Sequence, residues 1–113
     1  MTIQFTKQED IDRIVNIVKK YKEQDFVFTN YYYYRIKLRD ISHEFLLKTF
    51  FAFEKIKLIE QDVLSRGDIG YDLYYEIEKN RTLIIGVAPK GKLIFIHGIL
   101  RYRNWLGSVK KKE

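Results

Sequence analysis

The residues of this chain that could do chemistry on a substrate are concentrated in its last third. Five of them suit acid–base chemistry at a phosphate: Glu76, Arg81, His97, Arg101 and Tyr102. His or Glu can act as general acid or base, and Arg can stabilise the negative charge of a transition state. Cleavage of RNA needs a base for the 2′-hydroxyl, an acid for the leaving 5′-oxygen and cations around the phosphate. We therefore treat these residues as catalytic candidates of a ribonuclease that needs neither a metal nor another cofactor.

The same residues also have a structural interpretation, which the sequence leaves open. His97 shares its strand parity with Phe95 and Ile99, and this pattern predicts a hydrogen-bonded histidine beside the core. Glu76 alternates with apolar residues, which is typical of a solvated strand face. Neither residue indicates catalysis by its type alone.

Excess positive charge is confined to the C-terminal end of the chain. The formal net charge is +6, Lys and Arg balance Asp and Glu over residues 1–88, and the excess therefore resides in residues 89–113. Clustered cations bind polyanions by displacing counterions from phosphates, so we expect RNA or another nucleic acid as a partner. Arg and aromatic side chains together can hold phosphates and stack on bases. The candidate nucleic-acid-binding residues of this segment are Lys90, Lys92, Arg103 and Trp105.

Composition narrows the class of protein. The chain has no cysteine, which excludes disulfides and thiolate chemistry, and its two histidines argue against a His-based metal site. No apolar run approaches the roughly 20 residues of a membrane-spanning helix, and no signal-peptide pattern opens the sequence. We expect a cytoplasmic protein without a membrane partner, and a homo-oligomer is compatible with the sequence. Residues 1–106 fit one domain, followed by a basic tail at residues 107–113 that could equally serve solubility.

The elements that must position these residues begin with helices. Apolar residues at helical spacing predict a first helix over residues 7–23. Ser42 is a suitable N-cap for another helix, whose apolar residues surround most of its girth, so we expect it at the centre of the core. Residues 26–38 are ambiguous, because their aromatic run favours a strand whereas Thr29 or Asn30 could cap a helix.

The hydrophobic period changes after Ile56. A strand is predicted over residues 57–63, and strict alternation predicts one over residues 69–78. Further strands are expected over residues 82–88 and 92–101, joined by short turns as in an antiparallel meander. The expected fold class is α+β, with two or three N-terminal helices packed on a sheet of three or four antiparallel strands.

Residues 35–46, which read RIKLRDISHEFL, resemble a known motif. The motif is R-M-x-x-R-G-I-S-x-E-x-V, found in a family of small domains within the RelE-like toxin superfamily, whose fold barnase, EndoU and colicin nucleases share. The resemblance covers roughly residues 28–104 and favours a helix in the ambiguous segment. Arg35 and Arg39 take the places of the two motif arginines and join the nucleic-acid-binding candidates. Tyr31 stands where the family usually has a histidine, and Asp40 where it has a glycine.

This resemblance implies a RelE-like ribonuclease, the toxin of a toxin–antitoxin pair, with an antitoxin protein as a second partner. Two other functions remain open: a nucleic-acid-binding protein of the same fold that does not cleave, and a protein-interaction module. The four tyrosines at residues 31–34 also allow two interpretations. They could form a stacking platform for bases, or a helix could turn two of them toward the core.

Overall fold

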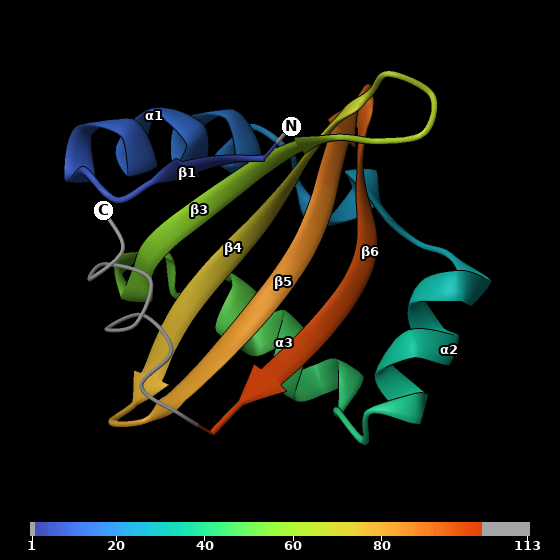
Figure 1. Cartoon of the computed structure of the whole chain (residues 1–113). Helices are drawn as coiled ribbons and strands as arrows, with labels where there is room; N and C mark the ends of the chain where they lie inside the picture. Colours follow the sequence, from blue (N-terminus) through green and yellow to red (C-terminus); the bar gives the residue numbers. More distant parts are fainter. Residues whose placement is uncertain (1, 103–113) are drawn as a thin grey trace.

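The structure, a computed structural model, describes residues 2–102 (Figure 1). Within these residues the helices are α1 (Gln8–Lys19), α2 (Asn30–Leu38) and α3 (His43–Phe50), with short 3-10 turns η1 (Glu23–Asp25) and η2 (Phe53–Lys55). The strands are β1 (Ile3–Phe5), β2 (Phe26–Phe28), β3 (Ile56–Val63), β4 (Ile69–Glu78), β5 (Arg81–Lys90) and β6 (Lys92–Arg101). The α+β class is confirmed, whereas the expected number of strands is too low.

The strands form one mixed sheet in the order β1-β3-β4-β5-β6-β2. Strands β3 to β6 are successive antiparallel neighbours, β1 pairs antiparallel with β3, and β2 runs parallel to β6. The prediction of a purely antiparallel sheet is therefore wrong at the β2 edge. Each edge strand has three residues, too few to leave a periodic signal. Both interpretations of residues 26–38 are correct for a part of the segment, because β2 precedes Thr29 as a strand and α2 follows it as a helix.

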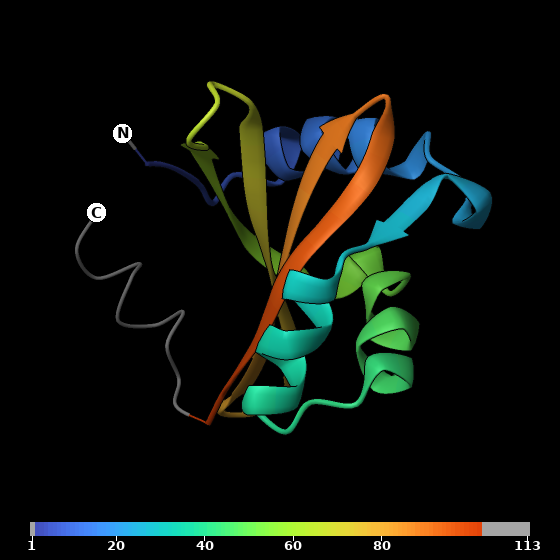
Figure 2. The same cartoon turned by 90° about the vertical axis from the view of Figure 1, so that its right-hand side faces the viewer.

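The main hydrophobic core lies between the helices and one face of the sheet, which we call the helix face (Figure 2). The N-cap predicted for α3 is confirmed, since Ser42 Oγ accepts a hydrogen bond of 3.2 Å from the N–H of Phe45. None of the helices within residues 2–102 is long and apolar enough to span a bilayer. The helices contribute Ile11, Ile14, Val15, Val18, Tyr32, Ile36, Leu46 and Phe50 to the core.

The other face of the sheet, which we call the opposite face, is ordered in rows that run across the strands. Residues directly opposite each other in antiparallel strands point to the same face, so the register defines these rows. The first row contains Gln4, Glu60, Asp72, Gly86 and His97. The second is Leu58, Tyr74, Ile84 and Ile99, and the third is Glu76, Thr82 and Arg101.

A β-bulge in β6 determines the face on which His97 lies. Phe95 and His97 pair with consecutive residues of β5, so Ile96 between them is an extra residue. Such an insertion reverses the alternation of side chains along the strand. Phe95 packs in the main core, whereas Ile99 packs on the opposite face. His97 therefore shares a face with Ile99, as the sequence suggested, but not with Phe95, because the bulge between Phe95 and His97 leaves no periodic signature.

Tyr75 connects the sheet to the end of α3. Its hydroxyl donates a buried hydrogen bond of 2.7 Å to the carbonyl oxygen of Phe50. Burial raises the pKa of the Tyr75 hydroxyl well above its usual value, and the charge of Glu54 adds to this effect. The neutral hydroxyl is thus the form that the fold requires.

We expect Tyr75→Phe to lower the free energy of unfolding by about 1–3 kcal/mol, because the Phe50 carbonyl loses its buried donor. Since the pKa is raised in the folded state, the hydroxyl stabilises the fold below an unfolded-state pKa of about 10, and this stability is lost at higher pH. The loss from about pH 9 to about pH 12 should therefore be smaller in the variant. Urea unfolding across this range measures both effects, with Tyr34→Phe as control because Tyr34 is 62% exposed. Equal alkaline losses in wild type and Tyr75→Phe would contradict the assignment.

Candidate functional site

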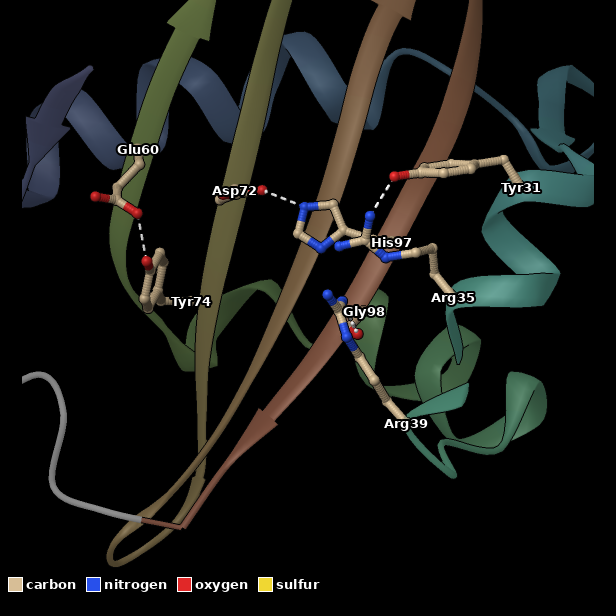
Figure 3. A network of polar contacts seen from close by, with 8 residues as sticks. All are labelled: Tyr31, Arg35, Arg39, Glu60, Asp72, Tyr74, His97 and Gly98. Carbon is tan, nitrogen blue, oxygen red and sulfur yellow. Dashed lines mark hydrogen bonds and ion pairs between the residues drawn. The ribbon is translucent and has the colours of Figure 1, made fainter. Parts of the chain in front are cut away.

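Helix α2 carries Tyr31, Arg35 and Arg39 on one side, because these residues are spaced by four. The helix begins after Thr29, whose Oγ1 accepts a hydrogen bond of 3.1 Å from the N–H of Tyr32. Tyr32 is fully buried, which fixes the rotation of the helix about its axis. In this orientation the two arginines extend from α2 toward β6 (Figure 3).

The charges of two other arginines act on the guanidinium group of Arg39 where α2 lies along β6. Arg35, Arg39 and Arg101 are called here the arginine cluster. Nη1 of Arg39 donates a hydrogen bond of 3.0 Å to the carbonyl oxygen of Gly98. Burial lowers the pKa of Arg39 below its usual value, and the charges of Arg35 and Arg101 lower it further. A bound anion would relieve this repulsion, so the cluster suits a phosphate group.

Tyr31 holds one member of the arginine cluster. Its hydroxyl accepts a hydrogen bond from Nη1 of Arg35, and the guanidinium carbon lies 5.2 Å from the centre of the Tyr31 ring. Tyr31, Tyr33 and Tyr34 are exposed, whereas Tyr32 is buried. Helix α2 thus turns one of the four tyrosines into the core, rather than two, and leaves Tyr31 at the arginine cluster.

His97 of β6 and Asp72 of β4 form a pair across β5, the strand that lies between them. Nε2 of His97 lies 3.0 Å from Oδ1 of Asp72, although β5 separates their strands. Gly86 of β5 lies between them in the same row. A Cβ atom on Gly86 would lie 2.5 Å from atoms of the His97 ring and 2.9 Å from Oδ1 of Asp72. The sequence does not point to Asp72 or Gly86, because only the register of the strands relates them to His97.

The contact with Asp72 selects the tautomer of a neutral His97 ring. A carboxylate accepts hydrogen bonds, so Nε2 carries the proton and Nδ1 holds the free lone pair of the neutral ring. Nδ1 is buried and has no hydrogen-bond partner within residues 2–102, and the side chain is 16% exposed. His97 is therefore oriented like a general base, with its basic nitrogen shielded from solvent.

A pocket of about 260 Å³ with an acidic lining adjoins His97 on the side of β3. Glu60, Asp62 and Asp72 contribute its carboxylates. The Tyr74 hydroxyl donates a hydrogen bond to Glu60, and burial followed by this bond raises the pKa of Tyr74. No group of three or more His, Asp or Glu side chains within the described residues could hold a metal ion. His97 and Asp72 thus line the acidic pocket themselves, and Arg35 and Arg39 lie on the side of His97 that faces α2 (Figure 3).

Two of the other catalytic candidates share the opposite face with His97. Arg101 belongs to the arginine cluster. Glu76 lies four residues along β4 from Asp72, which is roughly 13 Å at about 3.3 Å per residue. Arg101 lies equally far along β6 from His97, in the same row as Glu76, so the backbone positions of both residues are separated from the His97–Asp72 pair by the same distance.

The remaining catalytic candidates, Arg81 and Tyr102, lie apart from His97. Arg81 precedes Thr82 of the opposite face and lines a pocket with residues of α3, so it points to the helix face. Its guanidinium carbon lies 5.6 Å from the centre of the Tyr102 ring, and its Nη1 lies 3.3 Å from a carboxylate oxygen of Glu78. The structure therefore separates Arg81 and Tyr102 from the His97–Asp72 pair.

The basic residues predicted to bind nucleic acid are also divided. Lys90 and Lys92 pair at the turn before β6, at the opposite end of this strand from Arg101. Nζ of Lys90 forms an ion pair of 3.0 Å with Asp68. Arg103 and Trp105, with the tail at residues 107–113, lie outside the described residues.

A scan of protein-family models finds no match to this chain, and searches of curated proteins and of solved structures find none either. The likeness of residues 35–46 to RelE-like domains therefore remains an expectation from the sequence. A function can therefore be proposed only from the contacts of the site. These are the contact that orients His97, the arginine cluster, and the hydrogen bond between Tyr31 and Arg35.

We expect Gly86→Ala to break the His97–Asp72 contact and to lower the free energy of unfolding by about 1–3 kcal/mol, because the new methyl group overlaps the imidazole ring. NMR spectra of the ring and urea unfolding measure the two effects. In a His97→Ala background the same substitution should cost much less, since the overlapping ring is gone. Equal costs in both backgrounds would show that the ring does not lie over Gly86.

Proposed function

We propose that this chain is a metal-independent endoribonuclease of the RelE-like type, with its site where α2 lies along β6. The observation that carries the proposal is the His97–Asp72 pair beside the arginine cluster. An oriented acid–base group next to cations that can hold a phosphate is the minimum needed for RNA cleavage.

In this reaction the arginine cluster binds the scissile phosphate of a single-stranded RNA. Nδ1 of His97 accepts the proton of the 2′-hydroxyl, and the 2′-oxygen attacks the phosphorus atom. Asp72 stabilises the imidazolium that forms. The bond from phosphorus to the 5′-oxygen breaks, and the leaving oxygen takes the proton of the Tyr31 hydroxyl, which is free to donate because Arg35 is the donor in their contact. The products are a 2′,3′-cyclic phosphate and a 5′-hydroxyl end.

A RelE-like fold and an antitoxin partner are part of the same proposal. The likeness of residues 35–46 supports it, as does the order of two helices followed by four antiparallel strands. An antitoxin would inhibit the enzyme by covering the arginine cluster. Tyr34 and Leu38, which are exposed on the same helix as Arg35 and Arg39, offer such a protein an apolar contact.

Nucleic-acid binding without cleavage is a second candidate, and the burial of the histidine favours it. Nδ1 of His97 is shielded from solvent, and Nε2 is occupied by Asp72. RNA held by the arginine cluster reaches the ring only when neighbouring side chains move. The cluster itself binds phosphate whether or not the ring is reached.

We expect the purified protein to cleave labelled single-stranded RNA in the presence of EDTA, and ribosome-bound message in a separate assay that keeps the Mg²⁺ the ribosome requires. His97→Ala should lower the rate by about 10²–10⁴-fold, the usual contribution of a general base. Tyr31→Phe should lower it as well, whereas Arg66→Gln, in the exposed turn between β3 and β4, should not. Cleavage that persists in His97→Ala would exclude the proposed base.

The same assay separates the candidate functions. Salt-dependent binding without any product would select the non-cleaving protein. Failure to bind RNA or DNA at low salt would remove both nucleic-acid functions and leave a protein-interaction module.

We expect Arg39→Gln to weaken RNA binding and to reduce the slope of log K against log salt concentration by about 0.7, the value for one phosphate contact on a single strand. Fluorescence anisotropy at several salt concentrations measures this slope. Arg66→Gln is the matched control, since it removes the same charge from an exposed turn. An unchanged slope in Arg39→Gln would exclude this arginine from the interface.

A further inference from the structure

A second pocket lies at the end of the sheet, between α3 and the hairpin that joins β4 to β5. Its volume is about 310 Å³, roughly the lower end of the 300–1,000 Å³ range of small-molecule sites. We call it the hairpin pocket. It is lined by Phe45, Lys48, Thr49, Ala52, Lys55, Ile77, Glu78 and Arg81.

Three elements bring cations to the hairpin pocket. Lys48 comes from the last turn of α3, Lys55 from η2 and Arg81 from the start of β5. Glu78 supplies the one carboxylate of this lining, and its Oε1 lies 3.3 Å from Nη1 of Arg81. Positive charge is therefore in excess at the pocket, which favours an anionic ligand.

Arg81 adds a specific hydrogen-bond donor. Its Nη1 is directed at Glu78, and its guanidinium carbon lies over the Tyr102 ring. Its Nε is buried and has no hydrogen-bond partner within residues 2–102. A buried N–H group without a partner is unfavourable. Because this atom is buried, the Arg81 side chain must turn before a ligand in the pocket can accept a hydrogen bond from it, and that bond would remove the cost. Phosphate oxygens are strong acceptors for Arg donors.

The rest of the lining is apolar apart from Thr49, whose Oγ1 donates a hydrogen bond of 2.8 Å to the carbonyl oxygen of Phe45. Phe45, Ala52 and Ile77 are partly buried and form a wall beside the cations. A ligand that fits this combination has a phosphate group joined to a flat, weakly polar body. A nucleotide has this chemistry, because its base can lie against apolar side chains while its phosphate meets the cations.

We propose that the hairpin pocket binds the phosphate group of a nucleotide, with Arg81, Lys48 and Lys55 as its ligands. The nucleotide is either a free mononucleotide or the phosphorylated end of an RNA strand. The pocket lies on the helix face and shares no residue with the His97–Asp72 pair or the arginine cluster. The proposal therefore does not rest on RNA cleavage.

NMR titration of the full chain tests the proposal, with the side-chain Nε–H signal of Arg81 as reporter. The probes are adenosine 5′-monophosphate, adenosine, inorganic phosphate and a short RNA with either a 5′-phosphate or a 5′-hydroxyl. We expect a saturable shift of the Arg81 signal with the monophosphate and little shift with adenosine. The double variant Lys48→Gln/Lys55→Gln should weaken this binding about tenfold or more, whereas Lys20→Gln, at an exposed lysine after α1, should not change it.

The RNA probes identify the source of the phosphate. Tighter binding of the 5′-phosphorylated RNA than of the monophosphate indicates a strand end, and the reverse order indicates a free nucleotide. The proposal is overturned if no phosphate-bearing nucleotide shifts the Arg81 signal, if adenosine binds equally well, or if the lysine double variant binds as wild type does. His97→Ala should leave the titration unchanged, so loss of cleavage and loss of this site are distinguishable.

Discussion

The single extra residue in β6 is the constraint on which the arrangement of the site depends. Ile96 shifts the alternation of side chains by one position. Phe95, before the extra residue, therefore lies in the main core, and His97, after it, lies on the opposite face. The same shift turns Gly98 toward α3, where a Cβ atom would lie 2.4 Å from Leu46. Without the bulge, His97 would lie opposite Ile85 and its imidazole would enter the main core, while Ile96 would occupy the first row of the opposite face and Gly98 the second. The packing of α3 and the position of His97 thus share one cause.

Much of the fold follows from local sequence signals, and the site does not. Ser42 predicts the start of α3, and the alternation of β4 predicts a half-buried strand, because both signals act over a few neighbouring residues. Asp72 and Gly86 acquire their roles only through strand register, which joins residues far apart in sequence. Arg81 is basic like Arg101, yet the pleat sends it to the other face. The sequence shows where charged residues lie along the chain, but it does not show which face of the sheet carries them.

Charge on the opposite face is separated across the His97–Asp72 pair. The carboxylates of Glu60 and Asp62 line the pocket on the β3 side, whereas Arg35 and Arg39 extend over β6 from the side of α2 (Figure 3). A polyanion is therefore attracted toward one side of the histidine and repelled from the other. For the proposed nuclease, such a field would favour an RNA strand that follows α2 over one that crosses the whole sheet.

The short strand β2 pairs with β6 only over Phe26–Phe28, opposite the first residues of β6. Helix α2 continues the chain along this edge, and Arg39 donates to the carbonyl of Gly98. Exposed strand edges invite the addition of further strands from other molecules. At Gly98 a guanidinium takes the hydrogen-bonding position that a neighbouring strand would otherwise fill. The arginine proposed to bind phosphate therefore also helps to end the sheet, because a strand added at Gly98 would have to displace its guanidinium group.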